Sequence, residues 1–318
     1  MARVLCFGEA LIDMLAEPTG RYRPCAGGAP ANVAVALAKL GVEASFIGML
    51  AEDAFGDLLL AELGSAGVAT DQVVRTGAAN TALAFVSLGA QGERRFSFYR
   101  PPAADLLFRA GHFKPERFRD AAAFHCCSNS LTEAGIAEAT LHGVQLAREA
   151  GALISVDVNY RAGLWPTHAD ARPRIWSLLR EADVVKLSAD ELAYLAEPLR
   201  DEAAAIAELW AGRCRWLLIT DGPALIRHLT RDTEDTADTY EVESVNTTGA
   251  GDAFMAGILA GLAQTRAEGF AAFLASTEQV DGTLRLAAAC GALAVTRHGA
   301  FEAMPTLAEV DDLMERQP

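Results

Sequence analysis

Lysine is scarce in this chain: only Lys39, Lys114 and Lys186 occur among its 318 residues. Acidic residues exceed basic ones, 42 to 27, and the formal net charge is −15 at pH 7. A surface this acidic repels nucleic-acid phosphates and anionic lipids, so we expect neither nucleic acid nor a membrane as a partner. An anionic substrate would have to be held by local dipoles and a few basic side chains.

The six cysteines do not form a recognisable framework, because the sequence has no CxxC pair and no Cys/His cluster of the zinc type. The chain leads directly into the strand-like residues 4–7 without a signal-peptide pattern, and no apolar run is convincing as a bilayer span. We expect reduced, mostly buried thiols in a cytoplasmic enzyme.

Two common nucleotide-binding patterns are also missing. The P-loop pattern GxxxxGK[ST] does not occur, and after Gly249 and Gly251 the position that would complete GxGxxG is Phe254. The sequence therefore argues against a nicotinamide dehydrogenase or a P-loop enzyme.

Short β-rich runs alternate with helical stretches along most of the chain, which predicts an α/β fold with a mostly parallel central sheet covered by helices on both faces. We interpret residues 1–318 as one domain of this kind. The expected strands are 4–7, 45–49, 123–127, 153–157, 184–187 and 216–220, and the expected helices are 29–40, 133–150, 249–262 and 282–295. Residues 231–238 are expected to form a polar loop.

Two segments, about 11–25 and 81–100, break this alternation, because each reads as extended, hairpin-forming chain without a crossover helix. The second has a turn expected at 89–93. Both are too short for a domain, so we predict a small β-sheet lid beside the ligand-binding edge of the main sheet. A lid that excludes water would suit a kinase.

The most informative segment is residues 247–252, Thr-Thr-Gly-Ala-Gly-Asp, which opens a long apolar run. Gly249, Ala250 and Gly251 would leave the first turn of a helix uncovered, so its unpaired N–H groups could contact an anion. Asp252 could accept the proton of a hydroxyl that attacks a phosphoryl group. A carboxylate that only stabilises the helix end is the alternative, but the glycines, costing about 0.5–1 kcal/mol each inside a helix, favour a ligand site.

These residues resemble the motifs of the ribokinase-like (PfkB) carbohydrate kinases, and the resemblance covers nearly the whole chain. The first signature is Gly27, Gly28, Pro30, Asn32 and Ala34, and the second is residues 247–252. Within the family, three further stretches resemble those of fructokinases. They are Phe98, Tyr99, Arg100, Ala104 and Asp105; Asp157, Asn159, Arg161, Leu164, Trp165 and Pro166; and Lys186, Ser188 and Glu191.

The resemblance implies a role for each matching residue. Asp252 would be the catalytic base, with Gly249, Ala250 and Gly251 as the anion hole. The implied substrate-binding residues are Asp13, Gly27, Gly28, Asn32, Phe98 and Arg100. The implied ATP-binding residues are Arg161, Lys186, Ser188 and Cys290. Thr220, Asp221 and Gly222 are added to the ATP-binding residues because they follow a predicted buried strand and should lie near the nucleotide. The residues alone allow Asp13 as a turn residue, Asn32 as a helix-start residue and Cys290 as a helix-packing residue.

Two ions are implied as well. Glu191 matches the residue that orients Mg²⁺ through water, a reasonable arrangement because magnesium usually keeps several waters. Asn246 stands where the family usually has an aspartate associated with a nearby monovalent cation. Because the amide lacks the carboxylate charge, we expect weak dependence on K⁺.

The expected function is that of an ATP-dependent sugar kinase, with fructose converted to fructose 6-phosphate. A 2-keto-3-deoxygluconate kinase, a ribokinase-like or nucleoside kinase, and a catalytically silent sugar or nucleotide sensor remain as alternatives. A keto acid would need a cation for its carboxylate, for which Arg100 is the obvious candidate. Family likeness also implies a homodimer formed through the lid.

Overall fold

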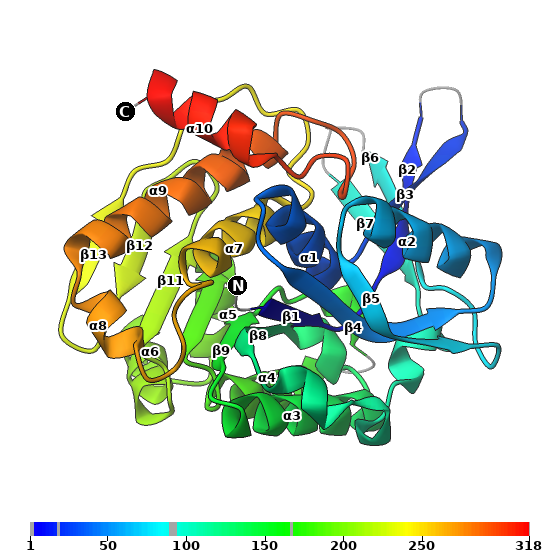
Figure 1. Cartoon of the computed structure of the whole chain (residues 1–318), viewed down its shortest axis with the longest axis horizontal. Helices are drawn as coiled ribbons and strands as arrows, with labels where there is room; N and C mark the ends of the chain where they lie inside the picture. The colour runs from blue at the N-terminus through cyan, green and yellow to red at the C-terminus, as the bar shows by residue number, and fades with distance from the viewer. Residues whose placement is uncertain (1–2, 18–19, 89–93, 166–167, 318) are drawn as a thin grey trace.

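The computed structural model describes residues 3–17, 20–88, 94–165 and 168–317. Its centre is a nine-stranded sheet with the order β13-β12-β11-β10-β9-β8-β1-β4-β5 (Figure 1). The strands are β1 (Arg3–Phe7), β4 (Ala44–Ala51), β5 (Ala69–Thr76), β8 (Ala121–Cys127), β9 (Leu153–Asp157), β10 (Val184–Ser188), β11 (Trp216–Thr220), β12 (Ile226–Leu229) and β13 (Glu234–Ala237). Seven strands pair in parallel, and only β12 and β13 are antiparallel.

Helices cover both faces of this sheet, as expected (Figure 1). One apolar cluster is shared by α1, α2, α7, α8, α9 and α10, and the other by α3, α4, α5 and α6. The helices are α1 (Ala29–Lys39), α2 (Ala54–Ser65), α3 (Ala134–Glu149), α4 (His168–Leu179), α5 (Ala189–Ala196), α6 (Glu202–Ala211), α7 (Ala250–Gly261), α8 (Phe270–Leu274), α9 (Thr277–Ala294) and α10 (Leu307–Arg316). The central strands are therefore buried on both sides, which explains their continuous apolar runs.

A second, four-stranded sheet has the order β3-β2-β6-β7. Its strands are β2 (Leu11–Ala16), β3 (Tyr22–Gly27), β6 (Leu83–Leu88) and β7 (Arg94–Tyr99). β2 and β3 form an antiparallel hairpin, as do β6 and β7, and β2 pairs with β6 in parallel. The extended chain expected at 11–25 and 81–100 is confirmed, while the expected turn at 89–93 lies outside the described residues.

Two expectations need correction. The segment 231–238 is not only a polar loop, because β13 (Glu234–Ala237) pairs with β12 at the edge of the main sheet. Residues 234–236 are exposed, so this edge strand carries no apolar alternation by which the sequence could reveal it. The helix expected to start at Gly282 starts earlier, where Ser276 caps α9 by accepting from the N–H of Gln279.

Small residues bring α7 and α9 into close contact. A Cβ on Gly257 would lie 2.4 Å from Cα of Ala287, and one on Gly261 would lie 2.3 Å from Oγ1 of Thr283. The two glycines therefore let the helix backbones approach closely. This packing fixes α7, whose N-terminus carries residues 249–252.

All six cysteines are buried and unpaired. Burial raises the pKa of each thiol, to about 12 for Cys126, Cys214 and Cys290. The expectation of reduced, apolar-like cysteines is confirmed.

Candidate functional site

The N-terminus of α7 is shaped by Gly249, which caps the helix in a left-handed conformation with φ of 79°. This left-handed conformation favours glycine, and a Cβ here would also lie 2.6 Å from Cε of Met304, the end of a flexible side chain. At Gly251, a Cβ would meet Nζ of Lys186 at 2.7 Å. The first amides of α7 and a lysine ammonium thus lie together, which is an arrangement that can hold an anion.

Asp252, in the first turn of α7, is 8% exposed and accepts a hydrogen bond of 2.7 Å from Nδ2 of Asn32 on α1. Burial raises the pKa of Asp252 to about 6, and the charge of Asp157 adds to the rise, whereas the Asn32 hydrogen bond lowers it. At neutral pH the group is mostly ionised and can accept a proton, as a general base must.

Asp13 on β2 lies close to the same point. Burial and the charge of Asp252 raise the pKa of Asp13 to about 7, while Arg161 opposes the shift. The chain is tight here, because a Cβ on Gly27 would lie 2.5 Å from Oδ2 of Asp13. Gly28, with φ of 113°, would place a Cβ 2.5 Å from the carbonyl oxygen of Glu9. Two carboxyl groups and the Asn32 amide therefore converge, a set that can bond to several hydroxyls.

Lys186 on β10 is buried and pairs with Asp157 on β9, with Nζ 3.0 and 3.1 Å from the two carboxylate oxygens. The charges of Asp157 and Glu191 outweigh burial and raise the pKa of Lys186. Glu191 accepts N–H bonds from Tyr160 at 2.7 Å and from Ser188 at 2.8 Å. A permanent positive charge is therefore fixed between acidic side chains beside the start of α7.

Further predicted residues lie where strands of the sheet end. Ser188 and Thr220 are register partners at the ends of β10 and β11, and Asp221 and Gly222 follow in an exposed turn. Arg161, after β9, is exposed. The carboxyl edge of a parallel sheet is where open α/β folds bind ligands, so these residues share one edge with Lys186.

Arg100, predicted to bind substrate, is paired within the protein. It is 2% exposed, and its guanidinium donates to Oδ2 of Asp105 at 2.6 and 2.9 Å and to Oγ1 of Thr132 at 3.2 Å. The charge of Arg100 is thus already compensated within the protein.

Phe98 on β7, also predicted to bind substrate, is half-buried and faces Gly163. A Cβ placed on Gly163 would lie 3.4 Å from the Phe98 ring.

Two polar residues near this edge escaped the sequence analysis. Glu9, just after β1, is buried and accepts a 3.0 Å bond from Nδ2 of Asn129, which follows β8. Burial raises the pKa of Glu9, and the nearby Arg100 charge opposes the rise. Both residues closely follow a buried strand, and this position in the sequence could have identified them as candidate site residues.

Cys290 and Asn246 have structural partners. Cys290 on α9 has no exposed surface, so its thiol packs in the core as the packing interpretation required. Asn246 is 4% exposed, and its Oδ1 accepts a 2.8 Å bond from the N–H of Thr248. This bond shapes the turn that leads into residues 249–252.

Among residues 3–17, 20–88, 94–165 and 168–317, no group of three or more His, Cys, Asp or Glu side chains is arranged to hold a metal by itself. Glu191 uses each carboxylate oxygen for one backbone N–H, which leaves a lone pair on each. A cation that keeps its waters and is held mainly by phosphate fits such a residue.

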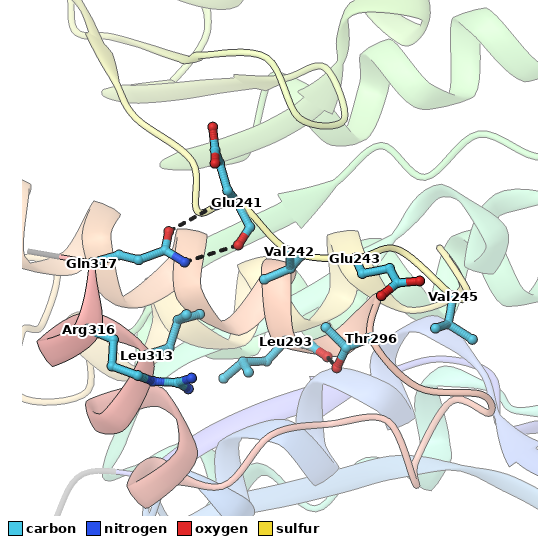
Figure 2. Close-up of a pocket in the computed structure, with 9 residues that line it drawn as sticks. All are labelled: Glu241, Val242, Glu243, Val245, Leu293, Thr296, Leu313, Arg316 and Gln317. Atoms are coloured by element: carbon cyan, nitrogen blue, oxygen red, sulfur yellow. Dashed lines mark hydrogen bonds between the residues drawn. The ribbon is translucent and has the colours of Figure 1, made fainter.

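A separate pocket of about 440 Å³ lies between the chain leading to Asn246, the end of α9, and α10 (Figure 2). At one end of the pocket, Gln317 accepts from the N–H of Glu241 at 3.1 Å and donates to its carbonyl at 3.0 Å. None of the predicted site residues lines this pocket.

Within the described residues, no helix is long and apolar enough to cross a bilayer.

An amide-lined helix start beside a buried carboxylate, on an α/β sheet covered on both faces, is suited to phosphoryl transfer to a small molecule. The chain belongs to the pfkB family of carbohydrate kinases, whose family profile matches residues 1–307. The family and the ribokinase-like fold expected from the sequence are both confirmed.

Three proteins similar to this chain are named fructokinases. Fructokinase-1 of Oryza sativa subsp. japonica is 40% identical over 98% of this chain and 97% of its own length. The fructokinase of Xylella fastidiosa with bound ATP is 52% identical with a TM-score of 0.96, over 99% of this chain and 98% of that one. The fructokinase of Vibrio cholerae O395, with fructose, ADP and calcium ion bound, is 28% identical with a TM-score of 0.89, over 98% and 99% of the two chains.

Proposed function

We propose that this carbohydrate kinase is an ATP-dependent fructokinase that forms fructose 6-phosphate and ADP. The observation that carries the proposal is the buried Asp252, bonded to Asn32 at the amide-lined start of α7. The sugar assignment is supported by the relatives named fructokinase. The buried pairing of Arg100 with Asp105 weighs against a keto acid, which would need an uncompensated cation.

In the proposed reaction, Asp13, Asn32 and the backbone at Gly28 bind sugar hydroxyls and aim the 6-hydroxyl at the γ-phosphorus of ATP. Asp252 accepts the hydroxyl proton as the new O–P bond forms and the bond to the ADP oxygen breaks. The N–H groups at Gly249–Gly251 stabilise the charge on the transferring phosphoryl group.

The nucleotide is proposed to lie along the carboxyl edge of β9, β10 and β11. The exposed Arg161 supplies positive charge for its phosphates. Lys186, whose charge Asp157 balances, supplies an N–H donor beside Gly251. Mg²⁺ would neutralise phosphate charge, with Glu191 orienting its waters. Thr220, Asp221 and Gly222, at and just after the end of β11, would line the nucleotide side.

The test is a coupled ADP-release assay with ATP and Mg²⁺, run with fructose, other sugars and 2-keto-3-deoxygluconate. We expect fructose to give the highest kcat/KM. Binding of fructose without turnover would instead support the sensor, and preference for the keto acid would support the other kinase.

Asp252→Asn should lower kcat by about 10²–10⁴-fold and leave the affinity for fructose nearly unchanged, because the amide cannot accept the proton. Asp57→Asn is the matched control, since Asp57 also lies in the first turn of a helix but is exposed and distant in sequence. Near-normal turnover by Asp252→Asn would remove this residue as the base.

We also propose weak dependence on K⁺, because Asn246 lacks the charge of the usual aspartate. Replacing NaCl by KCl at constant ionic strength should change kcat little, whereas Asn246→Asp should gain a response to K⁺. Strong activation of the wild-type enzyme by K⁺ would refute this proposal.

A cytoplasmic location and a homodimer formed through the lid complete the proposal. The six unpaired cysteines are consistent with a reducing compartment. The dimer is supported by aromatic side chains on the lid sheet, where the rings of Tyr22 and Phe85 are 5.1 Å apart and those of Phe85 and Tyr99 are 5.2 Å apart. Tyr99 is 67% exposed although it is a large apolar ring.

A further inference from the structure

Residues 299–304, which we call the brace loop, contact both halves of the site. Cε of Met304 occupies the space over Gly249, 2.6 Å from where a Cβ would be. On the sugar side, Cβ of Ala300 lies 3.4 Å from a Cβ placed on Gly27, and the N–H of Phe301 donates to the carbonyl of Ala26 at 3.4 Å. Movement of this loop would therefore disturb the helix start and the sugar-binding glycines together.

Lys39 holds the brace loop. It is the last residue of α1, and its Nζ donates to the carbonyl of Phe301 at 2.8 Å and to that of Met304 at 2.9 Å. Phe301 and Met304 are both buried, so their carbonyls need partners, and an ammonium group supplies strong, charge-assisted donors. The same helix carries Asn32, bonded to Asp252, near its other end.

The other lysine outside the site gives a contrast. Nζ of Lys114 also donates to a main-chain carbonyl, that of Asp71 at 3.0 Å, but this bond is exposed. Lys39 is half-buried. Burial and Arg297 lower the pKa of Lys39, whereas Glu309 and Glu302 favour its charged form.

We propose that Lys39 is a positioning residue for phosphoryl transfer: through the brace loop, it holds Met304 against Gly249 and Ala300 against Gly27. This role rests on the proposed function, because it acts on the anion hole and the sugar site. It does not require Lys39 to touch either substrate.

The test compares Lys39→Met, which keeps the length of the side chain but removes its charge and donors, with Lys39→Arg, which keeps both. Lys39→Met should lower kcat by about tenfold or more and raise the KM for fructose, since small misplacements of reacting groups cost up to about 10²-fold. Lys39→Arg should recover most of the loss. Lys114→Met is the matched control and should keep both constants.

A double mutant tests the route through Met304. Met304→Ala should itself lower kcat, and Lys39→Met in that background should lower kcat little further, because the contact with Gly249 is already lost. It should still raise the KM for fructose, because the contact of Ala300 with Gly27 remains. Independent, multiplying losses of kcat in the two variants would overturn the proposal, as would a Lys39→Met enzyme with a lower Tm but wild-type kcat and KM. A wild-type protein without kinase activity would instead overturn the proposed function.

Discussion

At the scale of single residues, the site depends on carboxyl groups kept at pKa values far above their usual range. Burial raises the pKa of both Asp13 and Asp252, and the charge of Asp252 adds to the rise at Asp13, so the two pKa values reach about 7 and about 6. Because the base must be ionised, we expect kcat/KM for fructose to fall as the pH drops through this range.

Asn32→Leu should shift this fall in kcat/KM, the acid limb of the pH profile, to higher pH. The Asn32 N–H bond favours the charged form of Asp252, so its removal raises the pKa of the base. The measurement is kcat/KM for fructose between pH 5 and 9, with Lys114→Met as the control. A limb that stays in place or moves to lower pH would show that Asn32 does not tune Asp252.

The sequence predicted the local part of the site but not its long-range pairs. Residues 249–252 lie together in the chain, so their joint chemistry could be predicted from spacing alone. Asn32 and Asp252 are 220 positions apart, and only the family resemblance placed them together. The partners of Arg100 and Glu9 followed from neither source, because they depend on which buried charges face each other after folding.

At the scale of elements, the position of the proposed anion hole, at the start of α7, depends on how α7 packs against α9. Gly257→Ala should push the helices apart, since its Cβ would lie 2.4 Å from Cα of Ala287. We expect a loss of about 1–3 kcal/mol in the free energy of unfolding, as for overpacked cores, together with a lower kcat.

Gly282→Ala is the matched control for that prediction. Gly282 lies in α9, and a Cβ added there would have no neighbouring atom within 4 Å. Alanine should therefore stabilise the protein by about 0.5–1 kcal/mol through helix propensity. Denaturant unfolding and steady-state kinetics check both variants. A Gly257→Ala protein as stable as the wild type would show that the helices can separate without cost.

Burial also decided which elements could be predicted. Six of the seven parallel strands are mostly apolar because both of their faces are covered, and these six were predicted from the sequence within a few residues. The seventh, β5 (Ala69–Thr76), lies at the edge of the sheet, is only partly buried and was not predicted. β13 (Glu234–Ala237) is polar and lies at the edge of the sheet. Its main-chain pairing with β12 is what makes it a strand, and no side-chain pattern records that.

At the scale of the whole molecule, the lid sheet should join two copies. Sedimentation of the wild-type protein is expected to give a dimer, and Tyr22→Lys should shift it toward the monomer, because a charge would be buried in the interface. Leu307→Lys, at an exposed apolar residue of α10, is the control. A wild-type monomer at all concentrations, or no effect of Tyr22→Lys, would contradict the proposed dimer.

The buried cysteines also make the protein convenient for optical measurement. None of the six native thiols is accessible enough, or acidic enough, to react readily with a maleimide dye. One cysteine introduced at an exposed position beside the β2–β3 hairpin, such as Arg21→Cys, would therefore be labelled selectively. Fluorescence from that single dye could follow the hairpin in real time as sugar and nucleotide are added.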